Sequence, residues 1–174
     1  MTMFASLLAD PIETERLRLR RLTLADAAAF HAMTDDPAII EAIDFLRAPF
    51  EVADAEALIK GRGDGTDCFW GIWPRERGTL IGTIGAHVRG SDEIEIGYWL
   101  ASLFHGRGFA GEAARAIIAA LASAFPRHRI HAECRPDNAA SWKLLEKIGF
   151  RADGRAGQRA GRARLVYARA NLTA

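Results

Sequence analysis

Two glycines, Gly106 and Gly108, lie where a strand pattern gives way to a helix pattern. Residues 93–100 alternate polar and apolar side chains, and apolar side chains then recur at helical spacing, so we predict a strand, a tight turn and a helix that begins near Gly108. The first N–H groups of a helix have no internal partner, the helix dipole adds positive charge there, and glycine lets another group approach its backbone closely. The turn therefore suits a phosphate or pyrophosphate, and the alternative is an ordinary strand-to-helix connection.

The composition is that of an ordinary globular domain. The chain has 174 residues, of which 49% are hydrophobic and 26% charged, so we predict one domain over residues 1–174. The formal net charge of +1 offers no basic field for nucleic acid or for an anionic membrane, and we expect neither as a partner. Residues 1–10 are apolar but short and lack a basic start, which predicts neither a signal peptide nor a membrane span.

The cysteines indicate a reducing environment. Cys68 and Cys134 are far apart in the sequence, and no cluster of Cys and His has the spacing of metal ligands. We therefore expect two buried, reduced thiols in a cytoplasmic protein, and no metal.

Strands and helices alternate along most of the chain. We predict strands at residues 16–22, 68–73, 79–88, 93–100, 130–134 and 164–168, with another between the last helix and the final strand. We predict helices after Thr23 (an N-cap with Asp26 three residues on), at 52–60, from Gly108, and from a cap at Asp137 or Asn138 to Gly149. Residues 39–45 are expected to form a mobile connection. The first two helices and this connection could form one wall of a substrate pocket or simply cover the core.

The order of these elements indicates the fold class. The three strands between residues 68 and 100 follow one another directly and should be antiparallel, whereas the strand at 130–134 follows a helix and should run parallel to 93–100 through a right-handed crossover. We predict an α/β (α+β) domain whose mixed, mostly antiparallel central sheet has about six to seven strands, with helices on both faces.

Four motifs, taken in order, carry a family resemblance. They are ETERLRLR at 13–20, LIGTIG at 80–85, EIGYWL followed by GRGFA between 95 and 110, and NAASWKLLEKIGF at 138–150. Together they cover almost the whole chain, which resembles the GNAT N-acetyltransferases, and in particular the RimJ/RimL-like branch that includes the ribosomal-protein N-terminal acetyltransferases. The resemblance implies the GNAT fold, acetyl-CoA as cosubstrate, and transfer of the acetyl group to a primary amine.

The resemblance also implies a binding site for the cosubstrate. The turn that it places against the CoA pyrophosphate consists of His105, Gly106, Arg107, Gly108, Phe109 and Ala110. His105 departs from the Gln or Arg that the family prefers, but the backbone makes the expected contacts. Leu100 matches the strand end that pairs with the pantetheine arm, and Asn138 and Ser141 match positions that face the pantetheine and the thiol.

Acetyl transfer to an amine requires a base, an oxyanion donor and a proton for the leaving thiolate. Glu95 is the first candidate for the base, directly or through water, because it shares a strand face with Gly97 and Trp99 a few residues before the strand ends. Weaker alternatives are Glu93, Asp92 and His87, of which His87 is better explained as structural. The family resemblance places the oxyanion donor at a backbone N–H near Leu100.

The acid is less clearly indicated. Many family members place a tyrosine where this chain has Leu145. Ser141 resembles the residue that the ribosomal-protein branch uses, although a hydroxyl near a helix start can also bond its own backbone. Tyr98 and Tyr167 remain open as alternatives.

Several alternatives stay open. The expected mechanism is direct transfer in a ternary complex to a protein N-terminus or a small amine. The alternative is a catalytically silent acyl-CoA-binding module. A nucleotide-phosphate enzyme is disfavoured because no Lys-Ser/Thr follows the turn. A homodimer is possible. We expect the strand tryptophans to lie in the core and the arginines of residues 151–164 to lie in a solvated loop; these residues are Trp70, Trp73, Trp99, Arg151, Arg155, Arg159, Arg162 and Arg164.

Overall fold

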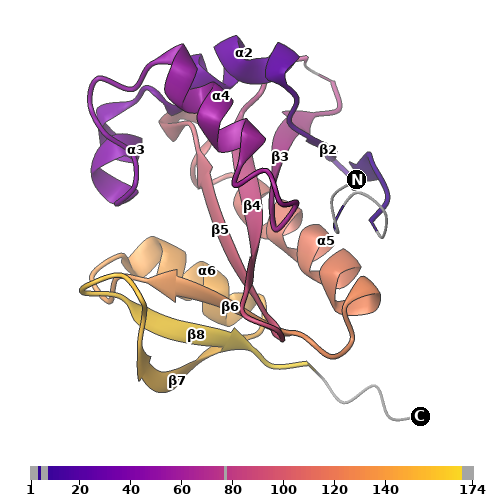
Figure 1. Cartoon of the computed structure of the whole chain (residues 1–174), viewed down its shortest axis with the longest axis vertical. Helices are drawn as coiled ribbons and strands as arrows, with labels where there is room; N and C mark the ends of the chain where they lie inside the picture. Colours follow the sequence, from indigo (N-terminus) through magenta and orange to yellow (C-terminus); the bar gives the residue numbers. More distant parts are fainter. Residues whose placement is uncertain (1–3, 5–7, 77, 170–174) are drawn as a thin grey trace.

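A computed structural model of the chain describes residue 4, residues 8–76 and residues 78–169 (Figure 1). Most of residues 1–10, for which the sequence predicted no signal peptide, therefore lie outside the described part of the chain. None of the described helices is long and apolar enough to cross a membrane.

The centre of the molecule is a mixed sheet of eight strands in the order β1-β2-β3-β4-β5-β6-β8-β7. The class and the antiparallel majority match the prediction, but six to seven strands was too few. The strand without a sequence signal is β1 (Ile12–Glu13), which pairs antiparallel with β2 (Leu17–Arg21). Two residues are too few to show a period-2 pattern, so only the pairing reveals this strand.

The remaining strands follow the predicted order. Strand β2 pairs antiparallel with β3 (Asp67–Pro74), β3 with β4 (Gly82–Arg89), and β4 with β5 (Glu93–Leu100). Helix α5 (Phe109–Ala124) then leads to β6 (Arg129–Cys134), which runs parallel to β5 as predicted. Helix α6 (Ala139–Lys147) is followed by β7 (Phe150–Ala156) and β8 (Ala163–Tyr167), and β8 lies between β6 and β7.

The parallel pair β5–β6 is short, and this feature creates the site. Residues 93–96 of β5 pair with 129–132 of β6, and no pairing follows between Gly97 and Leu100. Beyond this point β6, β8 and β7 diverge from β5 together with α6, as Figure 1 shows. The second half of β5 therefore has one edge without a partner strand among the described residues.

Three helices and a short 3₁₀ turn cover one end of the sheet. They are η1 (Leu24–Asp26), α2 (Ala27–Thr34), α3 (Pro37–Ala42) and α4 (Val52–Lys60), seen at the top of Figure 1. The predicted mobile connection at 39–45 was wrong for its first half, because α3 forms there. Pro37 occupies the first turn of α3, and the carboxylate of Asp36 accepts the N–H of Ala38 and caps the helix.

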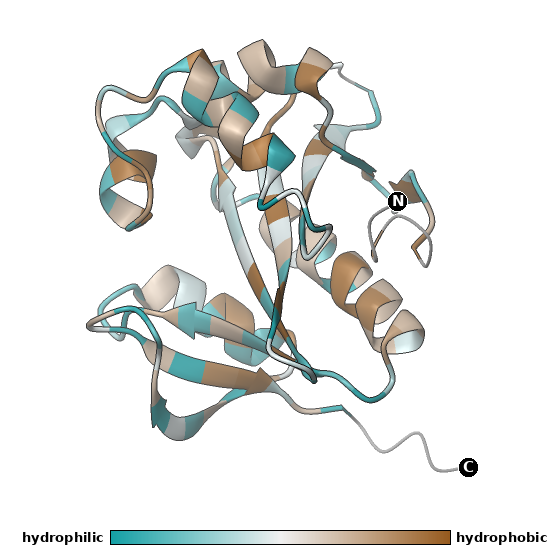
Figure 2. Ribbon diagram, in the orientation of Figure 1, coloured by the Kyte–Doolittle hydropathy of each residue, from teal (hydrophilic) through white to brown (hydrophobic). Residues whose placement is uncertain are grey.

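The two faces of the sheet bury different side chains. One face packs against α5, which is largely brown in Figure 2 and buries Ile117, Ile118 and Leu121. On the other face, Phe69 and Trp99 pack under the N-terminal helices. The core prediction is confirmed for two of the strand tryptophans and wrong for the third; Trp70 and Trp99 are buried, and Trp73 is partly exposed.

Candidate active site

A cavity of about 1000 Å³ opens where β5 and β6 separate. The glycine-rich turn and the start of α5 line one end, and α3, α4 and the β7–β8 turn line the other. The exposed edge of β5 runs between these two ends. The cavity therefore has the glycine-rich turn at one end and an unpaired strand edge along its length.

The glycine-rich turn has the backbone that an anion site needs. Gly106 and Gly108 have φ angles of 72° and 79°, a conformation that L-residues rarely adopt. Gly108 is the N-cap of α5 and provides no side-chain cap, so the first N–H groups of the helix are open toward the cavity. Gly106, Gly108, Phe109 and Ala110 line the cavity, as the sequence indicated. Arg107 does not, and its guanidinium lies 5.5 Å from the ring centroid of Phe104.

Glu112 fixes this turn to the rest of the fold, which the sequence did not indicate. Its carboxylate accepts hydrogen bonds from the Thr14 hydroxyl at 2.6 Å and from the backbone N–H and Nε of Arg16 at 2.9 and 2.7 Å. Burial opposes ionisation, but these donors hold the pKa of Glu112 below its ordinary value. The guanidinium of Arg16 also donates to the carbonyl of Arg107 at 3.0 Å, so the β1–β2 connection, which is part of the ETERLRLR motif, holds the turn in place.

Three cations also line the cavity. Arg115 extends from α5, and Lys143 and Lys147 extend from α6. A bound polyanion such as the phosphates of CoA would meet both the open N–H groups and these side chains.

The unpaired edge of β5 presents backbone groups to the cavity. The carbonyl of Asp92 accepts from the N–H of Arg129 on β6, so every second residue from Asp92 directs its backbone groups toward that side. Tyr98 and Leu100 therefore direct theirs into the gap. The carbonyl of Leu100 is already bonded to Nε2 of His105 at 2.9 Å. His105 thus ties the turn to the strand end, which is a structural role that the family pattern of Gln or Arg did not suggest.

A pair of hydroxyls joins the two sides of the gap. The hydroxyl of Tyr98 on β5 lies 2.9 Å from that of Ser141 on α6. Asn138 caps α6 and accepts the N–H of Ser141 at 3.1 Å. The Ser141 hydroxyl therefore is not needed as a cap, and it bonds to Tyr98 across the gap. Burial raises the pKa of Tyr98 to about 12, so the phenol keeps its proton at neutral pH. Cys134 lies buried in the cavity wall, and burial raises the pKa of its thiol.

Glu95 lies on the floor of the cavity and is fully paired. Its carboxylate accepts from Nε of Arg89 at 2.8 Å and from the guanidinium of Arg159. In the sheet, Glu95 is the cross-strand partner of His87, which in turn is the partner of Asp67, so the three side chains form a row across β5, β4 and β3. The Asp67 contact of His87 depends on strand register, which the sequence did not reveal.

The solvated-loop prediction for the arginines of residues 151–164 was wrong for three of the five, Arg159, Arg162 and Arg164, which form ion pairs. Arg159 also bonds Glu133 at 2.9 Å, and Arg164 bonds Glu93 at 2.6 Å. These ion pairs fold the β7–β8 turn over the cavity instead of leaving it in solvent. Exposed arginines remain at 151 and 155.

Asp44 links the end of α3 to two arginines of the β6–β8 half of the molecule. It follows α3 and bonds Nε of Arg162 at 2.5 Å and the guanidinium of Arg135. These partners hold the pKa of Asp44 below its ordinary value, although partial burial opposes them. The guanidinium groups of Arg135 and Arg162 also donate to backbone carbonyls at the end of α3. The N-terminal helices are thereby clasped to the β6–β8 half of the molecule.

Replacing Asp44 with alanine is expected to loosen this clasp. The KM for the acceptor should rise by about twofold to fivefold, because an ion pair at a partly exposed site contributes about 0.5–1 kcal/mol. The KM for the cosubstrate should stay unchanged, since the clasp is remote from the glycine-rich turn. Steady-state kinetics with each substrate varied in turn measure both constants. Asp35→Ala is the control, at a half-exposed carboxylate whose one ion-pair contact among the described residues is His31 at 4.0 Å, and an equal effect there would contradict the role of the clasp.

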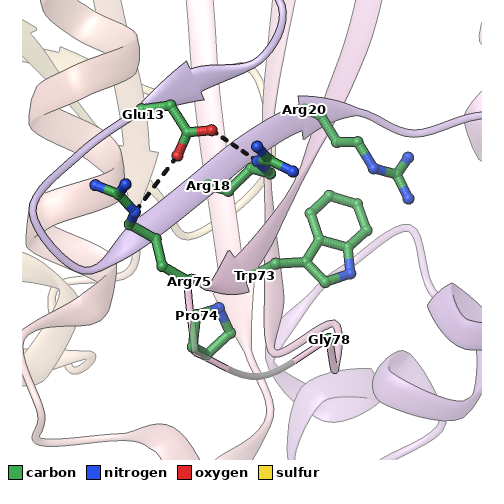
Figure 3. Close-up of a pocket in the computed structure, with 7 residues that line it drawn as sticks. All are labelled: Glu13, Arg18, Arg20, Trp73, Pro74, Arg75 and Gly78. Atoms are coloured by element: carbon green, nitrogen blue, oxygen red, sulfur yellow. Dashed lines mark hydrogen bonds and ion pairs between the residues drawn. The ribbon is translucent and has the colours of Figure 1, made fainter.

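A second hollow of about 420 Å³ lies away from the gap (Figure 3). Its arginines are already engaged: Arg18 and Arg75 pair with Glu13 at 2.7 and 3.8 Å, and Arg20 lies over the ring of Trp73 and pairs with an aspartate of η1. None of the residues that line this second hollow belongs to the first turn of a helix. The cavity beside β5 is therefore the candidate site.

Comparisons with known proteins agree on one family. Residues 16–151 match the family described as Acetyltransferase (GNAT) domain. The "Uncharacterized N-acetyltransferase YnaD" of Bacillus subtilis (strain 168) is 33% identical over 145 residues, which cover 82% of this chain and 84% of that protein. Two solved structures share the fold. A GNAT-family acetyltransferase from Bacillus anthracis has a TM-score of 0.74 and 27% identity (90% of this chain, 96% of that one). RimL, a ribosomal L7/L12 alpha-N-protein acetyltransferase in complex with coenzyme A, has a TM-score of 0.79 and 18% identity with the same coverage.

Proposed function

The chain belongs to the GNAT acetyltransferase family, and from that membership we propose that it transfers the acetyl group of acetyl-CoA directly to a primary amine within a ternary complex. The observation that carries this proposal is the cavity at the separation of β5 and β6, with an anion site at one end and an unpaired strand edge along its length. In a cytoplasmic setting, which we also propose, the two cysteines remain as free thiols.

The chemistry of the cavity suits acetyl-CoA. The open N–H groups at the start of α5, with Arg115, Lys143 and Lys147, would hold the phosphates. The backbone groups of Tyr98 and Leu100 would pair with the amides of the pantetheine arm, whose extended form resembles an added strand. This arrangement would bring the thioester to the Tyr98–Ser141 hydroxyl pair.

The reaction follows from these positions. A neutral amine attacks the thioester carbonyl carbon, and a backbone N–H of the β5 edge stabilises the resulting oxyanion. A group on the cavity floor takes the proton that the nitrogen loses as the N–C bond forms; Glu95 and His87 are the groups available there. The C–S bond then breaks, and Ser141 passes a proton to the thiolate and regains one through Tyr98.

The acceptor is a protein N-terminus or a small amine. We place the acceptor at the end of the cavity that α3, α4 and the β7–β8 turn line. This acceptor end carries both signs of charge, including Asp67, Glu95 and Arg159, so it favours neither a strongly cationic nor a strongly anionic molecule. An α-amino group has a pKa of about 7.7–8.0, compared with about 10.4 for lysine, so more of it is neutral at physiological pH. RimL acts on a ribosomal-protein N-terminus, which supports testing N-terminal peptides first.

Release of the CoA thiol against a panel of acceptors tests the proposal. The panel consists of N-terminal peptides, polyamines, amino acids and aminoglycosides, with acetyl-CoA binding measured separately by calorimetry. Turnover with one class, and a product that carries one acetyl group by mass spectrometry, is the expected result. Acetyl-CoA binding with no thiol release for any acceptor would instead favour the silent acyl-CoA-binding module.

A further inference from the structure

We propose that His87, oriented by Asp67, is the group that takes the proton from the acceptor amine, and that the amine lies in an open slot above Gly97. This inference rests on the proposed function and assigns its base. It also differs from the first expectation drawn from the sequence, which was Glu95.

His87 and Asp67 form a hydrogen-bonded pair at the cavity wall. Nδ1 of His87 lies 2.8 Å from Oδ1 of Asp67, and both side chains line the cavity. Burial works against ionisation, but hydrogen bonds from His87 and Arg62 keep the pKa of Asp67 below its usual range. A carboxylate can only accept a hydrogen bond, so Nδ1 carries the proton and the lone pair of the neutral imidazole is on Nε2.

The lone pair of Nε2 is directed toward free space. Nε2 makes no hydrogen bond to any described residue, and the atom is not among the buried, unpartnered polar atoms. A Cβ built on Gly85 would lie 2.8 Å from Nε2, so the ring leans along β4 over that glycine. The ring of Phe69 packs edge-on against the imidazole at 5.2 Å and holds it there.

The floor beneath Nε2 consists of two glycines. Gly85 is the cross-strand partner of Gly97 on β5. A Cβ built on Gly97 would meet nothing within 4 Å, so the space above it is open. Cross-strand neighbours on one face lie about 5 Å apart, which puts this slot within reach of Nε2 directly or through one water. Tyr98, whose backbone N–H faces the gap, follows Gly97 immediately.

Glu95 is less suited to the same task. Both of its oxygens accept from guanidinium groups, those of Arg89 and Arg159, and the carboxylate is buried. Accepting a proton from an amine would remove the negative charge that pairs with these two guanidinium groups. His87 needs no such change, because Asp67 occupies only Nδ1. We infer that Glu95 and its two arginines position the floor of the slot.

The proposed step balances. The neutral amine attacks the acetyl carbon; as the N–C bond forms, one N–H proton moves to Nε2 of His87, and Asp67 stabilises the imidazolium. The C–S bond breaks, and the thiolate receives its proton from the Ser141–Tyr98 pair. The imidazolium then loses its proton to solvent and the Ser141–Tyr98 pair regains one from solvent, so the products are the acetamide and CoA thiol.

Rescue by a small base is the direct test of a proton-accepting histidine. His87→Ala should lower kcat/KM for the acceptor by about 100-fold to 10,000-fold, the usual range for a general base, and leave the Kd of acetyl-CoA unchanged. Added imidazole should restore a measurable part of the rate in His87→Ala and none in wild type. His128→Ala, at a histidine that does not line the cavity, is the control. Loss without rescue in His87→Ala, together with an equal loss in Glu95→Gln, would overturn the proposal.

Two further measurements separate this inference from the proposed function. Gly97→Ala fills the slot without a clash, so it should raise the KM for the amine while the fold and the Kd of acetyl-CoA are kept. Nitrogen NMR of the imidazole should show His87 protonated on Nδ1 in wild type, and this preference should be lost in Asp67→Asn. If wild type acetylates no amine, the proposed function fails, but the NMR result still decides whether the His87–Asp67 pair exists. A protonated Nε2 in wild type would overturn the inference by itself.

Discussion

Gly106→Ala should weaken CoA binding by at least about tenfold, a loss of about 1.4 kcal/mol. The residue has a φ of 72°, and an L-residue there costs about 1–2 kcal/mol, which the turn can avoid only by changing its backbone. Such a change moves the open N–H groups at the start of α5, and the new Cβ enters the cavity that the phosphates would occupy. Calorimetric titration with CoA measures the effect.

Gly90→Ala is a closely matched control. Gly90 has a φ of 67°, and a Cβ at either glycine would meet nothing within 4 Å. The two variants should therefore lose similar stability in denaturant unfolding, about 1 kcal/mol each. Gly90 lies in the β4–β5 turn and does not line the cavity, so its variant should bind CoA as wild type does. Equal CoA affinity in both variants would contradict a phosphate site at the glycine-rich turn.

Ser141→Ala should lower kcat by about 100-fold, the lower end of the usual range for general acid catalysis, because the leaving thiolate loses its proton donor. The Kd of acetyl-CoA should change little, since the hydroxyl is a small part of a large contact. Tyr98→Phe should have a comparable effect, because its hydroxyl lies 2.9 Å from that of Ser141 and supplies the next proton. Single-turnover rates at saturating acetyl-CoA measure the chemical step directly.

The double variant distinguishes a proton relay from two independent contacts. If the two hydroxyls act as one unit, removing both should cost little more than removing either one. Ser91→Ala, at an exposed serine of the β4–β5 turn, is the control and should leave kcat unchanged. Additive losses, or a wild-type kcat in Ser141→Ala, would contradict the relay.

Much of the fold follows from local sequence signals. The cap of α6 was narrowed to Asp137 or Asn138, and the side chain of Asn138 makes the bond. Helix α4 begins and ends as its apolar spacing and Gly61 indicate. Helix α3 was missed because Asp36 and Pro37 suit both the end of one helix and the start of the next, and the caps alone do not decide between them.

The site was only partly accessible to sequence reasoning. The glycine-rich turn and Ser141 belong to local motifs, so they could be named in advance. The pairing of Asp67 with His87 depends on the register between β3 and β4, which no short pattern fixes. In the same way, the contact of Arg159 with Glu95 joins residues 64 positions apart in the sequence. The composition of the segment around Arg159 suggested a solvated loop, but the tertiary fold gives this arginine a buried partner.

The central claim is direct transfer of the acetyl group, and rapid-quench analysis with acetyl-labelled acetyl-CoA tests it most directly. Enzyme in excess over acetyl-CoA is mixed with and without the acceptor that the panel identifies, and label is followed on protein, CoA ester and amine. Without acceptor, all label should remain in acetyl-CoA; with acceptor, it should pass to the amine in one phase with none on the protein. Label that appears on the protein before the amine, for example at Cys134 or Ser141, would contradict direct transfer.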